Sequence, residues 1–278
     1  MTVTIVGLGL IGCSMAIDLK KTGFAKQIIG VDTNKQDQKT ALKNNYIDSA
    51  MNLSLAIKDS DIIILAVPVD VIGEILPSIL DLSKGKVVTD VGSVKYSIEK
   101  SINNHKNRRN FVSGHPIAGT ENSGVNAAES NLFNNKVVIL CDKQKSLKEA
   151  LEKIEKMYRF LNMNILYMNS KEHDIHCAYV SHISHLSSFA LALSVLDKEK
   201  DEENILNLAG GGFESTVRLA KSNAQMWNPI FINNKENIIE VLDNYINKLN
   251  DFKKAIKSGK RKELNELILQ ANKISKIV

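Results

Sequence analysis

The chain has 278 residues, of which 44% are hydrophobic and 24% are charged, with 15 glycines and 4 prolines. This composition excludes collagen-like, low-complexity and wholly disordered proteins, and it favours two globular domains. A net charge of +5, spread along the chain, suits anionic small molecules and gives no basic stripe for nucleic acid.

Cysteine usage and hydropathy limit the cellular setting. The 3 cysteines are scattered and lack CxxC spacing, which is typical of a reducing compartment and argues against disulfides and a thiolate zinc site. We find no apolar run approaching the roughly 18 to 20 residues that a membrane helix needs. The sequence therefore predicts a cytoplasmic protein without a membrane partner.

The first half of the chain is predicted to alternate between strands and helices. Strand-length runs occur at Thr2–Val6, Ile28–Val31, Asp61–Val67, Lys86–Thr89, Phe111–Val112, Lys136–Leu140 and Asn164–Tyr167. The alternation indicates an α/β fold with an open, mainly parallel sheet covered by helices on both faces. We predict an N-terminal Rossmann dinucleotide-binding domain over residues 1–168 and an all-helical C-terminal domain over residues 169–278.

The first strand is followed by a glycine motif that opens a helix. The motif GxGxxG comprises Gly7, Gly9 and Gly12, with Leu10 and Ile11 between the last two. In this setting the first glycine permits a tight turn, the second admits a pyrophosphate, and the third allows close helix–strand packing. Asp32 lies 20 residues beyond Gly12, where a carboxylate binds the adenosine ribose and repels a 2′-phosphate. The sequence therefore favours NAD over NADP as the cofactor.

Two later strands are followed by polar segments at the edge of the sheet where ligands collect. Ser93 lies in the segment after Thr89, and His115 lies in the segment after Val112. Gly114 and Pro116 flank the histidine, so we expect its ring to project from a rigid turn. A lone surface histidine is the alternative reading, but this position favours a function.

The helical half begins with four histidines, at positions 173, 176, 182 and 185. At about 100° per residue they cannot converge on one ion from a straight helix, so we predict no metal site. Ser181, His182 and His185 share an arc of about 100°. This polar stripe must bind a ligand or form a structural hydrogen-bond network.

A third polar cluster follows three glycines at positions 210–212. Arg218 is predicted on the first or second turn of the next helix, partly buried among apolar neighbours. A substrate carboxylate is the best geometric partner for its guanidinium, and an internal Asp or Glu is the alternative. Trp227 is the single tryptophan, and we expect it in the core or in a pocket wall.

An apolar seam with heptad spacing runs along a helix near the C-terminus. Its members are Ile238, Leu242, Tyr245, Leu249, Phe252 and Ile256. The seam is typical of either packing within the domain or a homodimer interface. Its length for a domain of this size favours the dimer.

Five segments, in chain order, resemble the prephenate dehydrogenase family. They are GLGLIG at 7–12, DVGSVK at 90–95, GHPIAGTENSG at 114–124, HDIHCAYVSHISH at 173–185 and GGGFESTVRLAKSNAQMW at 210–227. The resemblance extends from Val3 to about Tyr245. It implies an NAD-binding Rossmann domain followed by a helical domain that forms a homodimer.

The resemblance also implies an activity and a set of site residues. The activity is NAD-dependent oxidative decarboxylation of prephenate to 4-hydroxyphenylpyruvate, a step of tyrosine biosynthesis. His115 is implied to be the base for the C4 hydroxyl, and Ser93 to share that hydroxyl and orient the imidazole. The implied substrate-binding residues are Arg218 for a carboxylate, Ser181, His185 and Trp227 in the pocket, and Glu121 at its mouth.

The alternatives are other dehydrogenases and a protein without turnover. Arogenate differs from prephenate only in its side chain, so an arogenate dehydrogenase fits the same residues. A 3-hydroxyacid dehydrogenase would ordinarily carry a catalytic lysine where this helix has histidines and serine. A non-catalytic NAD-binding dimer would bind the nucleotide without turnover. Ser184 stands where the family often has proline, which should relax the helix start without moving His185.

Overall fold

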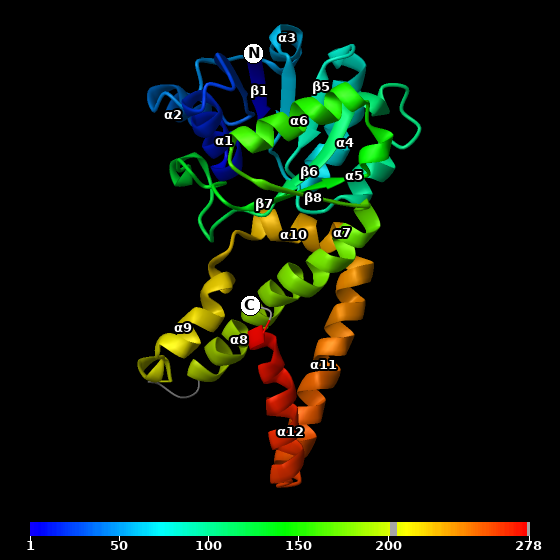
Figure 1. Ribbon diagram of the computed structural model, residues 1–278. Helices are drawn as coiled ribbons and strands as arrows, with labels where there is room; N and C mark the ends of the chain where they lie inside the picture. Colours follow the sequence, from blue (N-terminus) through cyan, green and yellow to red (C-terminus); the bar gives the residue numbers. More distant parts are fainter. Residues whose placement is uncertain (201–204, 277–278) are drawn as a thin grey trace.

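An eight-stranded sheet forms the N-terminal half of the molecule (Figure 1). The computed structural model describes residues 1–200 and 205–276. In spatial order the strands are β3 (Ser49–Ala50), β2 (Gln27–Val31), β1 (Thr2–Val6), β4 (Ile62–Leu65), β5 (Val87–Asp90), β6 (Phe111–Pro116), β7 (Val137–Cys141) and β8 (Asn164–Met168). Neighbouring strands pair in parallel except β6 and β7, which are antiparallel. This sheet and the helical region that follows confirm the predicted fold class.

Helices cover both faces of the sheet because its central strands are apolar on both sides. One buried cluster includes residues of α1 (Leu10–Lys21), α2 (Lys35–Lys43) and α6 (Lys148–Phe160). The other includes residues of α3 (Leu53–Asp59), α4 (Val69–Ser83), α5 (Tyr96–Ser101) and α10 (Ala224–Asn233). All residues of β4 are buried, as a continuous apolar run between two helical layers requires. Because α10 contributes to this core, the helical region is packed onto the sheet domain.

β6 is longer than the apolar pattern predicted, and His115 lies within this strand and not in a turn after it. The last four residues of β6 pair with β7, with His115 opposite Ile139. The prediction ended at Val112 because Ser113 and Gly114 are not apolar. The antiparallel partner nevertheless supplies the hydrogen-bond ladder, which an apolar pattern along one strand does not reveal.

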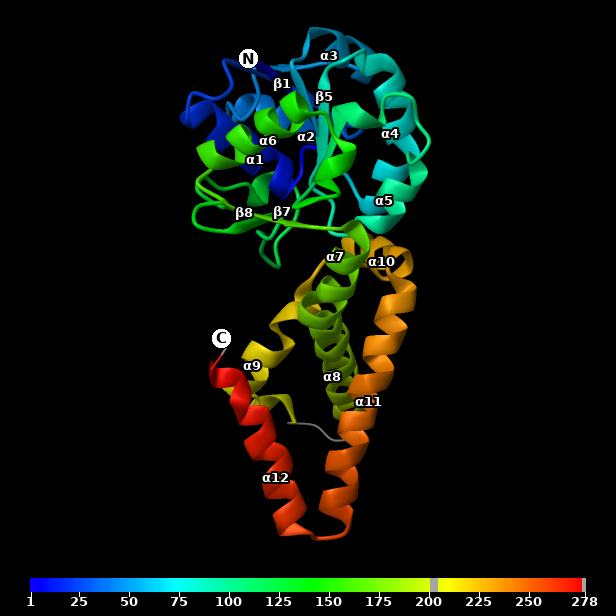
Figure 2. The same cartoon turned by 45° about the vertical axis from the view of Figure 1, so that its right-hand side comes forward.

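The helical region projects from one end of the sheet domain. It comprises α7 (Ser170–Cys177), the π-helical turn η4 (Ala178–His182), α8 (Ile183–Glu199), α9 (Gly211–Val217), η6 (Arg218–Lys221), α10, α11 (Lys235–Lys257) and α12 (Arg261–Ala271). The remaining short 3-10 turns are η1 (Arg108–Asn110), η2 (Val125–Ala127), η3 (Lys143–Lys145), η5 (Leu206–Leu208) and η7 (Asn272–Lys276). Figures 1 and 2 show α7 and α10 next to the sheet domain, while α8, α11 and α12 extend away from it.

The π-helical turn corrects the helical-wheel prediction. A constant α-helical angle of about 100° per residue does not hold across residues 178–182. The histidines nevertheless occupy different environments: His173 and His182 are buried, His185 is half-buried and His176 is exposed. π-helical turns insert one extra residue into a helix and are frequent at functional sites.

The apolar seam of α11 is mostly uncovered in the single chain. Ile238 is buried, but Tyr245, Leu249 and Ile256 are 38%, 51% and 65% exposed. Packing within the helical region therefore buries only Ile238 among the seam residues, and it leaves Leu242 and Phe252 half-buried.

The continuous helical segment Ser170–Glu199 qualifies the membrane prediction. By length and composition alone it could cross a membrane, with a mean hydropathy of 1.3 over its most apolar window, of which 11% is buried. Polar residues interrupt this segment, so it does not stand out in the sequence as one apolar run. The same composition is typical of a helix that another protein surface covers.

Candidate active site

The loop between β1 and α1 has the shape that a dinucleotide phosphate needs. Gly7 has a φ of +101°, and a Cβ there would lie 2.4 Å from the carbonyl oxygen of Ala66. A Cβ on Gly12 would lie 2.0 Å from the carbonyl oxygen of Gly7. At Gly9 no atom lies within 4 Å of the Cβ position, so the backbone is open to a ligand. Leu10 begins α1, whose first N–H groups are available to an anion.

Asp32 follows β2 and is held by this loop. Its Oδ2 accepts a hydrogen bond from the Leu8 N–H at 2.7 Å, and its Oδ1 accepts one from the Asn34 N–H at 2.8 Å. Each carboxylate oxygen retains a further lone pair. A ribose hydroxyl can therefore donate to a carboxylate whose orientation is already fixed.

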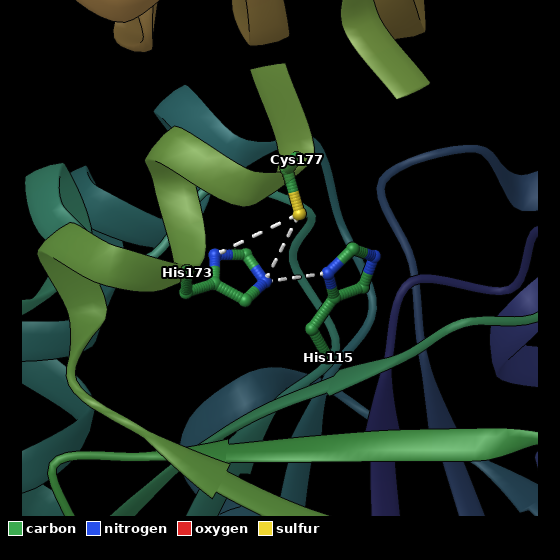
Figure 3. Close-up of side chains that lie close together, drawn as sticks. All are labelled: His115, His173 and Cys177. Atoms are coloured by element: carbon green, nitrogen blue, oxygen red, sulfur yellow. Dashed lines mark hydrogen bonds between the residues drawn. The ribbon is translucent and has the colours of Figure 1, made fainter. Parts of the chain in front are cut away.

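His115, His173 and Asp174 form a hydrogen-bonded chain that joins the two halves of the molecule. His115 Nδ1 lies 2.8 Å from His173 Nε2, and His173 Nδ1 lies 2.8 Å from Asp174 Oδ1. Because a carboxylate only accepts, we assign the His173 proton to Nδ1 and the acceptor role to its Nε2. His115 must then donate from Nδ1, which leaves its Nε2 unprotonated. Figure 3 shows this second nitrogen pointing away from His173 and Cys177.

Asp174 also fixes the position of the segment after β5. Its Oδ1 accepts from the Lys95 N–H at 2.8 Å and its Oδ2 from the Tyr96 N–H at 2.9 Å. The buried Lys95 ammonium donates to the Asp90 carboxylate and to the Gly114 carbonyl, the latter at 2.7 Å. These bonds connect the ends of β5 and β6 to the first helix of the helical region.

Burial keeps both rings of the chain neutral. It lowers the pKa of His115 well below the ordinary 6.5, and His173 and Lys95 lower it further. Burial also lowers the pKa of His173, although the Asp174 carboxylate opposes this effect. The unprotonated Nε2 of His115 is therefore able to accept a proton near neutral pH.

Trp227 holds two further histidines of the helical region. Its ring is buried and stacks on His185, with centroids 3.5 Å apart, and it contacts the edge of His182 at 5.9 Å. Burial lowers the pKa of His185, and it lowers that of His182 to about 4. The buried Nε1 of Trp227 has no hydrogen-bond partner among the described residues. Trp227 therefore packs against both histidines and retains an N–H group that can donate a hydrogen bond to a ligand.

The Arg218 side chain is about half exposed. It lies in the short turn η6 after α9, and its Nη1 is 3.0 Å from Glu121 Oε2. A hydrogen bond from its own backbone and the charge of Arg218 hold the pKa of Glu121 below its usual range. The structure thus pairs this arginine with an internal acid, the alternative left open by the sequence.

These contacts bring most of the predicted catalytic and substrate-binding residues to one region between the two halves. Asn234 Nδ2 donates to the Asp174 carbonyl at 2.8 Å and lies 3.1 Å from His182 Nδ1. Hydrogen bonds and ring contacts thus connect His115 to His182, Trp227 and His185. The pair of Arg218 and Glu121 is close enough for the Arg218 charge to lower the pKa of His185.

The two predicted serines are less closely involved. Ser93 follows β5 and is half-buried, but no described residue forms a hydrogen bond with its side chain. His173, and not Ser93, bonds the Nδ1 of His115. Ser181 accepts a bond from His185 Nδ1 at 3.0 Å through its backbone carbonyl. The substrate roles of both hydroxyls stay predictions.

Sequence reasoning missed His173 and Asp174. It compared the four histidines only with one another, as faces of one helix. The useful signal was the start of that helix: Asn169 caps it by accepting from the Glu172 N–H at 2.8 Å. A residue in the first turn after the last strand lies next to the sheet, where His115 is.

Comparisons with known proteins match both halves. Residues 15–167 match the nucleotide-binding domain of prephenate dehydrogenase, and residues 169–270 match the prephenate dehydrogenase dimerization domain. A prephenate dehydrogenase of Lactococcus lactis is 35% identical, covering 93% of this chain and 72% of the relative. One of Bacillus subtilis is 32% identical, covering 91% and 69%.

Solved structures agree over the full length. Prephenate dehydrogenase from Aquifex aeolicus has a TM-score of 0.91 and 32% identity, covering 99% of each chain. A complex of the Aquifex enzyme with hydroxyphenyl propionate and NAD+ has a TM-score of 0.86 and 32% identity, covering 100% of this chain and 97% of the other. Synechocystis arogenate dehydrogenase has a TM-score of 0.80 and 28% identity, covering 100% of both.

Proposed function

Because this chain belongs to the prephenate dehydrogenase family, we propose that it catalyses the NAD-dependent oxidative decarboxylation of prephenate to 4-hydroxyphenylpyruvate. The observation that carries the proposal is the neutral His115, whose Nδ1 is bonded to His173 and whose Nε2 is therefore free to accept a proton. A base of this kind contributes about 10²- to 10⁴-fold to a rate.

His115 Nε2 is the acceptor for the C4 hydroxyl proton of prephenate. The hydride leaves C4 with its bonding electron pair, and C4 becomes a ketone. The bond from the ring to the carboxylate then breaks, CO2 leaves, and the electron pair completes the aromatic ring. The proton held by His115 returns to the C4 oxygen, which becomes the phenol. The histidine is thereby regenerated.

The glycine loop and Asp32 fit NAD. The open space at Gly9, the free N–H groups of α1 and the fixed Asp32 carboxylate match a pyrophosphate and a ribose. Bound NAD would supply the acceptor for the hydride. The Asp32 charge supports NAD over NADP, because it would repel a 2′-phosphate.

Arg218, His185 and Trp227 fit the anionic substrate. Glu121 pairs with Arg218 through an exposed contact, and exposed ion pairs are weak because water screens them. A substrate carboxylate can therefore replace Glu121 as the partner of the guanidinium. The unpartnered Trp227 Nε1–H offers one further donor in the same region.

The test is NADH formation, followed by absorbance, with purified protein and each of four pairs: prephenate or arogenate with NAD or NADP. We expect turnover with prephenate and NAD, and its loss in His115→Asn. Faster turnover with arogenate would replace the proposed substrate, as the similarity to an arogenate dehydrogenase allows. Nucleotide binding without turnover of either substrate would indicate the non-catalytic dimer.

We also propose that a second copy of the chain covers the seam of α11. Leu249 and Ile256 are more than half exposed, and residues 169–270 match a dimerization domain. Light scattering after size exclusion should give the mass of a dimer. Ile256→Glu should shift it toward the monomer, whereas Lys253→Glu, an exposed control on the same helix, should not. A monomeric parent protein would refute the proposed dimer.

A further inference from the structure

His115, His173 and Cys177 bring three potential metal ligands together. Their ligand atoms all lie within 4.8 Å of one another (Figure 3). His115 belongs to β6, whereas His173 and Cys177 lie one turn apart on α7. The thiol has no role in the proposed reaction, and it is buried against the ring that positions the base.

The distances are close to those of a tetrahedral zinc site. Zinc–nitrogen and zinc–sulfur bonds of about 2.05 and 2.3 Å require separations of about 3.3 Å between nitrogens and about 3.6 Å between nitrogen and sulfur. Cys177 Sγ lies 3.5 Å from His173 Nε2, and His115 Nδ1 lies 2.8 Å from it. His115 Nδ1 and Cys177 Sγ lie within 4.8 Å of each other. The His115 ring, the one ligand group that is partly exposed, would therefore need to move about 0.5 Å away from His173 and up to about 1.2 Å toward the sulfur.

The surroundings also suit a metal ligand. His173 Nδ1 is bonded to the Asp174 carboxylate, and metal-binding histidines ordinarily donate their second N–H to such an acceptor. The bond orients Nε2 toward the other two ligand atoms and keeps it unprotonated. Two imidazoles and a thiolate favour Zn²⁺ over Mg²⁺ or Ca²⁺, which prefer oxygen.

We propose that His115 Nδ1, His173 Nε2 and Cys177 Sγ form an inhibitory Zn²⁺ site, with a fourth position open to water. The inference rests on the proposed function only where it predicts inhibition. The four histidines of the helical half were predicted to form no metal site. The site proposed here was not predictable from their spacing, because one ligand comes from the sheet domain.

Proton placement explains why the ion would inhibit. Zinc binding releases the Cys177 proton, since a coordinated thiol ionises, and it moves the His115 proton from Nδ1 to Nε2. A neutral imidazole holds one proton, so Nε2 can then no longer accept one from the substrate. The metal lies on the side of the ring opposite Nε2. Zinc should therefore lower kcat and change KM little.

The first experiment measures binding without turnover. The whole protein is titrated with Co²⁺, which substitutes for Zn²⁺ and gives a thiolate-to-cobalt charge-transfer band. We expect one equivalent per chain to produce the band, Zn²⁺ to abolish it, and Cys177→Ala to lack it. Cys141→Ala, which removes another buried thiol, should retain it. Absence of the band in the parent protein would overturn the site whether or not the protein turns over prephenate.

The second experiment measures inhibition. Zn²⁺ should lower kcat of the parent protein, and Cys177→Ala should need at least about tenfold more Zn²⁺ for the same loss, because it lacks a direct ligand. Cys177→Val, which keeps the site filled, should behave in the same way. Equal zinc sensitivity in the parent and both variants would overturn the proposal. A cobalt band in a protein without dehydrogenase activity would leave the metal site intact and refute the proposed function alone.

Discussion

Replacing His173 with leucine tests the hydrogen-bonded chain behind the proposed base. His173 is fully buried and bonds His115 Nδ1 at 2.8 Å, so the variant removes the acceptor that fixes the His115 proton. Asp174 keeps its bonds from the backbone N–H groups of Lys95 and Tyr96, so the two halves should stay docked. The change therefore acts mainly on His115.

The expected loss of kcat follows from the hydrogen bond between His173 and His115, because His115 is charged once it has accepted the substrate proton. Hydrogen bonds to charged groups contribute about 1.5 to 3 kcal/mol, which corresponds to roughly a 10- to 150-fold reduction in kcat. KM and NAD affinity should change little, because His173 touches neither ligand in the proposed reaction. His173→Gln, which keeps an acceptor, should recover part of the rate.

The measurement is steady-state turnover of prephenate, with NAD affinity and thermal stability determined for each variant. His176→Leu is the matched control, because His176 is exposed on the same helix. A kcat of His173→Leu within twofold of the parent protein would refute the reasoning. A large rise in KM with unchanged kcat would show instead that His173 acts through substrate binding.

The further predictions concern pH, substrate and cofactor. Because burial lowers the pKa of His115, the acid limb of the kcat/KM profile should lie below pH 6.5, and a midpoint above that value would contradict the neutral base. The same shift should make the folded state less stable as pH falls below 6.5, since the unfolded chain then binds more protons; urea titrations across pH check this. Arg218→Ala should raise KM for prephenate about 10- to 100-fold, as loss of a charge-assisted contact predicts. Glu121→Gln should lower KM up to about fivefold, because the arginine loses its competing partner. A KM that falls in Arg218→Ala and rises in Glu121→Gln would show that the arginine does not bind the substrate. Asp32→Ser should weaken NAD binding and bring the affinities for NAD and NADP closer together, as calorimetric titration with each nucleotide measures. An unchanged ratio of the two affinities would show that Asp32 does not determine the preference for NAD.

The positions of most strands along the chain followed from local sequence because each buried strand carries its own apolar signal. The run at 61–67 becomes β4, and the run at 2–6 becomes β1. The length of β6 was underestimated because its second half depends on pairing with β7, which is distant in sequence. β3 was missed because its two residues carry no periodic pattern.

The site was predictable where one segment contains the chemistry and less so where two segments share it. The glycine loop and Asp32 are spaced by a single βα unit, so their relation could be read from the chain. His115 could be selected from its place on the sheet edge, but its partner His173 lies 58 positions away. The acidic partner of Arg218, Glu121, lies 97 positions away in the sequence, so the residues next to the arginine could not reveal it.

The bond between His115 and His173 makes proton abstraction a property of both halves together. Nucleotide capture depends on the loop after β1 and on Asp32, so an isolated sheet domain could retain it. The tautomer of His115 is dictated across the domain boundary, where Asp174 also caps α5. A chimera that joined the two halves of different relatives would need a matching junction at this point to transfer protons, even if each half folded well.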